Sequence, residues 1–328
     1  MEQVTLGQLR VEGLPYYHIE KIYIETKAGR HGICDLQVMV HPDEEASLLQ
    51  KLEGKKIKIL HKEDLVFMGI IMQAEWLEQS DYNCLRVQAV TLSWDMDIQR
   101  HSRTFQLESK TLSDVANAIA KPYGVQVAVQ DNPVLPRMLY QHEETDWQFL
   151  VRLAESTGHL LFTNCASNRI ALSLGFVPFS ERKLATYDKI DNISLPVSTC
   201  LKVKENIRPH TMSCEFQDIG IITFDLQLTA GHGLEYEYRT QAVLESQIIS
   251  TDDLLVNHII LRHKEGCRPE AAEELRRTNM PQQLAGTILA VEGTNVKVKF
   301  DCDEQQNIDE ACWIPYENTV NNYQYSMP

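Results

Sequence analysis

The acidic segment Asp301-Cys302-Asp303-Glu304-Gln305 resembles part of a metal site. It begins like a calcium-binding loop, in which alternate side chains supply oxygen ligands. Such a loop needs glycine at its sixth position and glutamate at its twelfth, and this chain has Gln306 and Cys312 there. We therefore expect a solvated acidic loop between strands and no metal.

Histidine side chains offer two arrangements that a zinc site could use. The run His142-Glu143-Glu144-Thr145-Asp146 begins like a zinc-protease helix but lacks the second histidine one turn later. His258 and His263 would lie on different faces of a helix, and no Cys-x-x-Cys pair occurs. We expect residues 142–146 to be a polar lead-in to a helix, and no zinc ligand is predicted.

Familiar catalytic signatures are also missing from the sequence. There is no phosphate-binding Gly-x-x-x-x-Gly-Lys-Ser/Thr loop, no Gly-x-Gly-x-x-Gly and no Gly-x-Ser-x-Gly. With 46 acidic residues, adjacent pairs such as Glu143–Glu144 and Asp252–Asp253 carry no information about glycoside hydrolysis. We predict no catalytic, cofactor-binding or metal-binding residue, and we expect that the chain is not an enzyme.

Composition narrows the class of protein further. The 328 residues include 31 Lys and Arg against 46 Asp and Glu, a formal charge of −15. Nucleic-acid binding needs clustered basic side chains, and none is visible. No apolar run approaches the roughly 18–20 residues of a membrane span, and the N-terminus has no secretory signal. We expect a chain made in the cytoplasm, with its eight cysteines reduced and mostly packed in cores.

Residues 1–105 are predicted to form a small antiparallel β-barrel. Residues 21–26 and 33–40 alternate with period two around a turn at residues 27–32, which predicts a hairpin. A short helix with Leu48, Leu49 and Leu52 on one face follows. Strands are then expected at residues 57–60, 66–75 and 84–92, and closure into a barrel would remove the sheet edges.

Residues 106–195 are predicted to be an α+β domain. Thr111-Leu112-Ser113-Asp114 has the form of a helix N-cap, and Thr145-Asp146-Trp147-Gln148 is a full capping box. A strand is expected at residues 125–129. Gly158 fits the left-handed position after the second helix, and residues 159–162 and 169–174 are predicted to form a hairpin.

Residues 196–282 are predicted to form a second β-barrel domain with helical segments. Strands are expected at residues 199–204, 210–216, 220–225 and 234–238, and helices at the apolar run 254–261 and at 269–277. The tail, residues 283–328, has strand patterns at 286–291 and 296–300 around a turn at 292–295. Two or three strands cannot close a barrel, so we expect the natural protein to continue beyond this end.

Three stretches of the sequence have a distinctive combination of residues. Residues 141–158, QHEETDWQFLVRLAESTG, have the pattern Thr/Asp-aromatic-x-Phe-Leu-x-Arg-Leu followed by glycine. Residues 67–71 have the pattern Phe-x-Gly-x-Ile, and Ser93 with Asp97 the pattern Ser-x-x-x-Asp. Together these stretches resemble the VgrG-type spike proteins and phage late control protein D, the baseplate hub family of contractile injection systems. The tail, with residues 296–300 and 313–316, resembles the start of that family's oligonucleotide/oligosaccharide-type (OB) spike barrel.

This resemblance implies a fold and a mechanical function. The fold would be mainly β, with two antiparallel barrel-like domains, an α+β domain between them and a truncated OB-type spike barrel. The chain would be a homotrimer that adapts a hexameric tail tube to a three-fold spike. Its other partners would be spike tip or effector proteins and baseplate proteins, assembled into a type VI secretion system, a phage tail or a tailocin and delivered outside the cell.

Two other function classes stay open at this point. A cell-wall hydrolase at the particle tip would clear peptidoglycan in a zymogram, and we expect no clearing. A carbohydrate-binding or nucleic-acid-binding module is suggested by the barrel-like tail, but the chain lacks a basic stripe with an aromatic platform.

Overall fold

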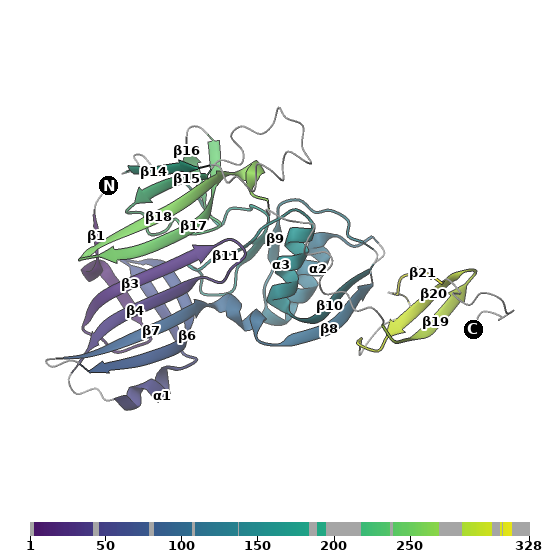
Figure 1. Ribbon diagram of the computed structural model, residues 1–328, viewed down its shortest axis with the longest axis horizontal. Helices are drawn as coiled ribbons and strands as arrows, with labels where there is room; N and C mark the ends of the chain where they lie inside the picture. Colours follow the sequence, from purple (N-terminus) through teal and green to yellow (C-terminus); the bar gives the residue numbers. More distant parts are fainter. Residues whose placement is uncertain are drawn as a thin grey trace.

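The structure is a computed structural model that describes residues 3–41, 46–78, 82–106, 109–136, 138–183, 189–194, 218–236, 239–268, 284–303, 309 and 311–316. Figure 1 shows a β-rich body at the N-terminal end, a central α+β region and a small β module at the C-terminal end. The predicted strands at 199–204 and 210–216 and the predicted helix at 269–277 lie outside the described residues.

One large sheet, with thirteen strands among the described residues, forms the β-rich body. Its order is β14-β15-β18-β17-β3-β4-β7-β6-β5-β2, with β1, β13 and β16 attached off this path. Its strands are β1 (Val4–Thr5), β2 (Leu9–Glu12), β3 (His18–Lys27), β4 (Ile33–Val40), β5 (Lys56–His61), β6 (Asp64–Glu78), β7 (Asn83–Thr91), β13 (Glu181–Lys183), β14 (Lys189–Ser194), β15 (Asp218–Thr223), β16 (Gly233–Tyr236), β17 (Arg239–Thr251) and β18 (Leu254–His263).

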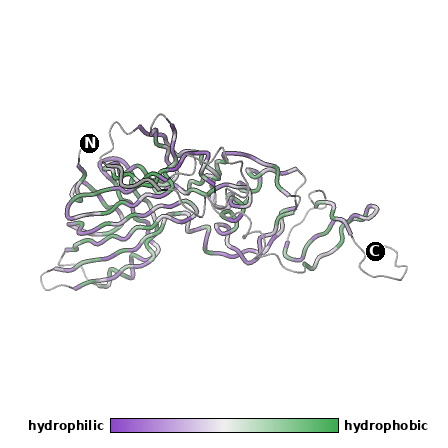
Figure 2. Tube along the Cα trace, turned by 45° about the horizontal axis from the view of Figure 1, so that its top comes forward, coloured by the Kyte–Doolittle hydropathy of each residue, from purple (hydrophilic) through white to green (hydrophobic). Residues whose placement is uncertain are grey.

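The large sheet curls until it is nearly closed. The short 3-10 helix η1 (Leu6–Gln8) connects edge strand β2 to β1, and β1 pairs with β18. Along β4 the buried side chains Cys34, Leu36, Val38 and Val40 alternate with outward ones, which gives the strand one apolar face. The same alternation of hydropathy is visible along other strands in Figure 2. The predicted mainly β, barrel-like fold class is confirmed.

The two β regions that the sequence separates are joined in this one sheet. Strand β17 pairs with β3, from Glu245 opposite Lys27 to Ile249 opposite Tyr23. The ammonium of Lys27 lies 2.6 Å from the carboxylate of Glu245 across this seam. Barrel-like regions far apart in the sequence are therefore hydrogen-bonded side by side.

The helix predicted for residues 254–261 is wrong, because this run is strand β18. Its residues Leu255, Ile259 and Leu261 are buried at period two, and Asp252 at φ 53° forms the tight turn from β17. A short apolar run does not distinguish a buried strand from a helix, and here pairing with β15 and β17 decides the outcome.

The central region contains two helices, a small sheet and a two-stranded ribbon. Both predicted helix starts are confirmed, since Thr111 and Thr145 are N-caps of complete capping boxes. The predicted hairpin is confirmed as β11 paired with β12, and β9 adds a parallel third strand. The elements are α2 (Leu112–Ala120), β9 (Val127–Val129), α3 (Asp146–Ser156), β11 (Leu161–Thr163) and β12 (Leu172–Leu174), with the ribbon of β8 (Arg100–Gln106) and β10 (Met138–Thr145).

A separate three-stranded sheet, which we call the C-terminal module, contains β19 (Gly286–Glu292), β20 (Asn295–Phe300) and β21 (Ile314–Pro315). The two predicted strands of the tail are confirmed, and the OB-type barrel stays a prediction. The other short helices among the described residues are η2 (Ala46–Leu48), α1 (Leu49–Leu52), η3 (Leu92–Asp97), η4 (Lys121–Tyr123) and η6 (Lys264–Gly266).

The predicted domain boundaries stay predictions, but pairing crosses two of them. Strand β8 begins before residue 105 and pairs with β10 of the central region. Strands β13 and β14, which precede residue 195, pair with β16 and β15 of the large sheet.

Candidate functional site

Hydrogen bonds at the N-terminus of helix α3 are made within its own first turn and to η3, the segment that follows β7 of the large sheet. The hydroxyl of Thr145 accepts from the backbone N–H of Gln148 at 3.1 Å, and the side chain of Gln148 accepts from the backbone N–H of Thr145 at 3.2 Å. The same hydroxyl donates to the carboxylate of Asp97, the last residue of η3. The capping box therefore also fixes where α3 meets the large sheet.

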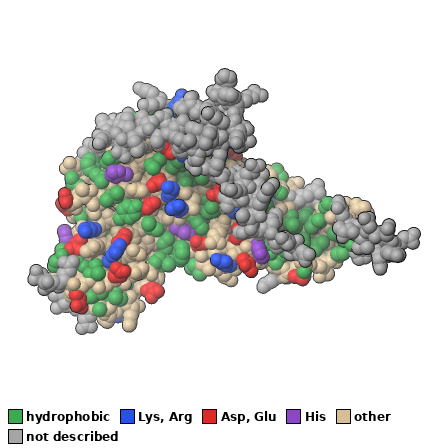
Figure 3. Space-filling view, viewed as in Figure 1, with side chains coloured by type: hydrophobic (Ala, Val, Ile, Leu, Met, Phe, Trp, Pro, Cys, Tyr) green, Lys and Arg blue, Asp and Glu red, His purple; other side chains and the backbone are tan. Residues whose placement is uncertain are grey.

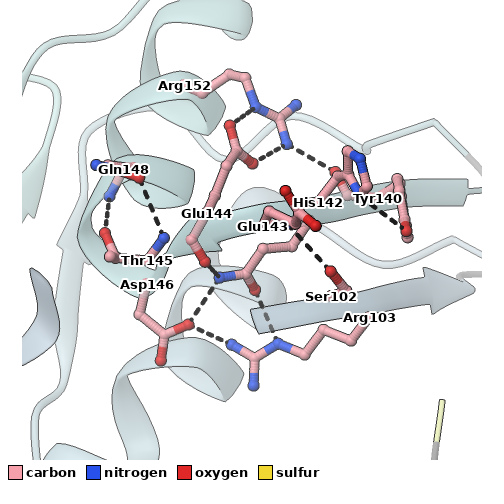
Figure 4. A network of polar contacts seen from close by, with 11 residues as sticks. Ser102, Arg103, Tyr140, His142, Glu143, Glu144, Thr145, Asp146, Gln148 and Arg152 are labelled. Carbon is pink, nitrogen blue, oxygen red and sulfur yellow. Dashed lines mark hydrogen bonds and ion pairs between the residues drawn. The ribbon is translucent and has the colours of Figure 1, made fainter. Parts of the chain in front are cut away.

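Asp146, the first residue of α3, is a buried carboxylate surrounded by donors. Its side chain accepts from Arg103 at 2.5 Å, from the amide of Gln141 at 3.0 Å and from the hydroxyl of Tyr123 at 3.0 Å. Figure 4 shows the Arg103 side chain pointing toward the Asp146 carboxylate. Gln141 reaches the same carboxylate from β10, the other strand of the ribbon. Burial and the Asp146 charge raise the pKa of Tyr123 to about 12. A carboxylate also suits this position because the helix dipole is positive at the N-terminus.

A second ion pair fixes α3 against the ribbon through Arg152, six residues after Asp146. The guanidinium of Arg152 holds both oxygens of Glu144, at 2.8 and 2.7 Å, and donates to the carbonyl of Tyr140 at 2.7 Å. It also lies 4.8 Å from the ring centroid of Phe149. Only arginine offers this planar fork together with an aromatic contact. The Arg of the sequence signature therefore has a structural role that spacing alone did not reveal.

His31 lies where the large sheet meets α3. Its Nδ1 is 2.8 Å from the hydroxyl of Ser93, and its Nε2 is 3.3 Å from the carboxylate of Asp97. Its ring lies against Trp147 of α3, with centroids 3.9 Å apart. A neutral ring protonated on Nε2 satisfies both contacts, and burial lowers the pKa of His31. Asp97 thus bridges His31 on one side and Thr145 on the other.

Ser93, His31 and Asp97 are the residue types of a hydrolase triad, but their placement does not suit a nucleophile. Ser93 is 1% exposed, and its hydroxyl lies 2.9 Å from that of Thr91. A reacting carbonyl must approach the serine oxygen, and this oxygen is enclosed. The arrangement instead connects two parts of the fold. Sequence reasoning named Ser93 and Asp97 but assigned His31 to a turn, because its partners are distant in the chain.

The other sequence candidates are not brought together. His142 and Glu143 lie on β10, where Glu143 is exposed at φ 49°, while Glu144 is buried against Arg152. Residues 142–145 end β10 and lead directly into α3, as expected for a polar lead-in. His258 and His263 lie on strand β18, not on a helix.

Residues 301–303 are the described part of the acidic run, and Asp303 among them differs from the expected solvated loop. Asp303 is only 8% exposed, because its carboxylate accepts from the backbone N–H and the hydroxyl of Thr104. Among the described residues, no three His, Cys, Asp or Glu side chains are grouped as metal ligands.

Of the six cysteines in the described residues, five are buried, as the expectation of core packing requires. Burial raises the pKa of Cys165 to about 11. Cys200 and Cys214 lie outside the described residues.

Among the described residues on the face seen in Figure 3, Lys and Arg side chains are scattered among Asp and Glu. An open cleft of about 310 Å³ is lined by side chains of both signs, including Asp131, His159 and Arg268. Within the described part of the chain, no helix has both the length and the apolar character that a membrane crossing requires.

Comparison with known proteins identifies solved structures that share this fold. A family profile described as the Alg8 N-terminal domain matches residues 34–173, less than half of the chain. No protein of curated function matches the sequence. Solved structures match much more of it. The E. coli c3393 protein, a component of the type VI secretion system with structural similarity to the T4 bacteriophage tail proteins gp27 and gp5, has a TM-score of 0.65 and 12% identity, over 93% of this chain and 92% of that chain.

Two tail proteins share the fold over a smaller part of this chain. A tail protein from Neisseria meningitidis has a TM-score of 0.55 and 15% identity, over 80% of this chain and 98% of that chain. The 43 kDa tail protein of prophage MuSo2 from Shewanella oneidensis has a TM-score of 0.55 and 12% identity, over 79% and 98%. The chain therefore has the fold of phage-tail and type VI secretion components. The expectation that it is not an enzyme agrees with these comparisons.

Proposed function

We propose that this chain is a structural hub or spike component of a contractile, phage-tail-like particle. The observation that carries this proposal is the shared fold, over 93% of the chain, with a type VI secretion component that itself resembles gp27 and gp5. The start of α3 adds to it, because Thr145, Asp146 and Arg152 contact Asp97, Arg103 and Glu144 and hold the fold together. The type VI system is favoured over a simple tail, since the two tail proteins cover only about four-fifths of the chain.

The finer assignment is a VgrG-type or late control protein D hub that assembles as a homotrimer. Each chain contributes two β regions joined at the β3–β17 seam. Three copies would supply six such regions, which is the number that a six-fold tail tube presents. The tube protein, spike tip or effector proteins and baseplate proteins are the partners in this proposal, and the C-terminal module is the start of an OB-type spike barrel.

Charge sets a condition on this assembly. A trimer of chains at −15 each carries about −45 by formal count. Contacts between subunits must therefore be apolar or locally charge-paired. Assembly in the cytoplasm, followed by incorporation into a particle that leaves the cell, is part of the same proposal.

The experiment that tests the proposal is co-expression of this chain with a tail-tube protein from the same genome. Light scattering after size-exclusion chromatography should give three times the monomer mass, and the trimer should co-purify with tube hexamers. Monomer at all concentrations and no tube binding would reject the hub assignment. Clearing of peptidoglycan in a zymogram would instead revive the hydrolase hypothesis, which no described residue supports.

A further inference from the structure

The C-terminal module is attached to the rest of the described chain without any shared strand. Its strands β19, β20 and β21 pair only with one another among the described residues. In Figure 1 the module lies beyond the β8–β10 ribbon, at the far end from the large sheet. Its orientation must therefore be set by other contacts.

Thr104 of β8 makes the first of these contacts. Its backbone N–H donates to one oxygen of Asp303 at 2.7 Å, and its hydroxyl donates to the other oxygen. Both residues are 8% exposed. Moving the buried Asp303 carboxylate away from its two donors would cost its full desolvation free energy. These two hydrogen bonds therefore hold Asp303 in one position relative to Thr104.

Gln106, two residues further along β8, makes the second contact. Its amide nitrogen donates to the carbonyl of Val298 in β20 at 2.7 Å, and its amide oxygen accepts from the backbone N–H of Cys312 at 3.1 Å. Gln106 is 4% exposed. One side chain therefore joins two separate segments of the module.

The alternate residues of β8 face helix α3. Arg103 donates to Asp146 and to Gln141, and the ring of Phe105 stacks on Phe149 with centroids 5.4 Å apart. Successive side chains of a strand point to opposite faces. Strand β8 thus contacts the C-terminal module on one face and the α3 network on the other.

We propose that Thr104 and Gln106 form a polar clamp through which β8 fixes the orientation of the C-terminal module against the central region. The clamp rigidly couples the module to α3, and through the His31–Trp147 contact to the large sheet. If the chain is a hub, as proposed above, this strand transmits force between the hub and the spike. The clamp itself does not depend on that function.

Hydrogen exchange on the intact chain tests the clamp. In Asp303→Ala the Thr104 amide loses its acceptor, and we expect exchange in peptides over β8 and residues 311–316 to accelerate by tenfold or more. Gln106→Ala should accelerate exchange over residues 311–316. Asp301→Ala, an exposed acid in the same loop, is the matched control and should change neither.

Small-angle scattering provides the second measurement. The clamp variants should give a broader distribution of interatomic distances than the wild-type protein and Asp301→Ala, while peptides over α3 keep their slow exchange. Unchanged exchange and scattering in both Asp303→Ala and Gln106→Ala would overturn the proposal. If Asp303→Ala misfolds, Thr104→Val removes only the hydroxyl and should give a smaller acceleration of the same peptides. Loss of trimer with an intact clamp would count against the hub function alone.

Discussion

The imidazole of His31 lies against the indole of Trp147, with the two ring centroids 3.9 Å apart. His31 follows the β3–β4 turn of the large sheet, and Trp147 belongs to the first turn of α3. Asp97 contacts both His31 and Thr145. The His31–Trp147 contact therefore lies at the junction between the large sheet, which has one hydrophobic core, and the central region, which has another.

Trp147→Ala should destabilise the chain strongly. Trp147 is 5% exposed, and truncating a buried aromatic side chain typically costs about 3–5 kcal/mol of unfolding free energy. Urea unfolding followed by circular dichroism measures this cost. Tyr17→Ala, which removes a side chain from a residue that is 47% exposed, is the control and should change the midpoint little. Equal effects of the two substitutions would contradict the assigned junction.

Acid should destabilise the folded chain through its buried histidines. Burial lowers the pKa of His31, His159 and His232 below the ordinary value of about 6.5. The folded state then favours the neutral rings, so its stability is full above about pH 6.5 and falls as pH drops towards the folded pKa values. The melting temperature should therefore decrease from pH 7.5 to pH 5.5.

His31→Gln separates the contribution of this histidine from the other two. Glutamine can still hydrogen-bond but does not titrate in this range, so the slope of melting temperature against pH should become shallower. The exposed His18 offers the control variant His18→Gln, whose slope should match that of the wild-type protein. An unchanged slope in His31→Gln would mean that His31 does not contribute to the acid sensitivity.

Local patterns in the sequence predicted local structure well. They did not predict contacts between residues that are far apart in the sequence. The alternation in residues 33–40 and the capping boxes at Thr111 and Thr145 each depend on residues within a few positions. The partners of His31 are 62 and 66 residues away, and Asp303 is 199 residues from Thr104. The helix prediction for residues 254–261 was wrong for the same reason, because the secondary structure of this run depends on which strands pair with it.

Arg152→Met should be costly because it leaves the Glu144 carboxylate buried without its guanidinium. The Glu144 side chain is 7% exposed, and removing one partner of a buried pair costs about 3–5 kcal/mol. Adding Glu144→Gln should recover part of the loss, which a double-mutant cycle of urea midpoints measures. Arg169→Met, at an exposed arginine, is the control. Additive effects would show that the pair is not coupled.

Gly69→Ala should perturb the large sheet although it adds a single methyl group. A Cβ at Gly69 would lie 2.4 Å from the carbonyl oxygen of Val90 and 2.6 Å from the ring of Phe67. Overpacking of this kind costs about 1–3 kcal/mol. Gly7→Ala is the matched control, since its Cβ would meet nothing closer than the Thr5 hydroxyl at 4.0 Å. Thermal unfolding should show a lower midpoint for Gly69→Ala only.

Thiol labelling should distinguish the buried cysteines from Cys302. Cys165 and Cys267 are 1% and 3% exposed, and burial raises their pKa values to about 11 and about 12, so little thiolate exists at neutral pH. We expect iodoacetamide at pH 7.5 to modify them at least tenfold more slowly than in urea, as measured by peptide mass spectrometry. Cys302 is partly exposed, so its labelling should be less sensitive to unfolding. Rapid native labelling of Cys165 would mean that the loop after β11 opens away from the large sheet, breaking its backbone bond to Met68.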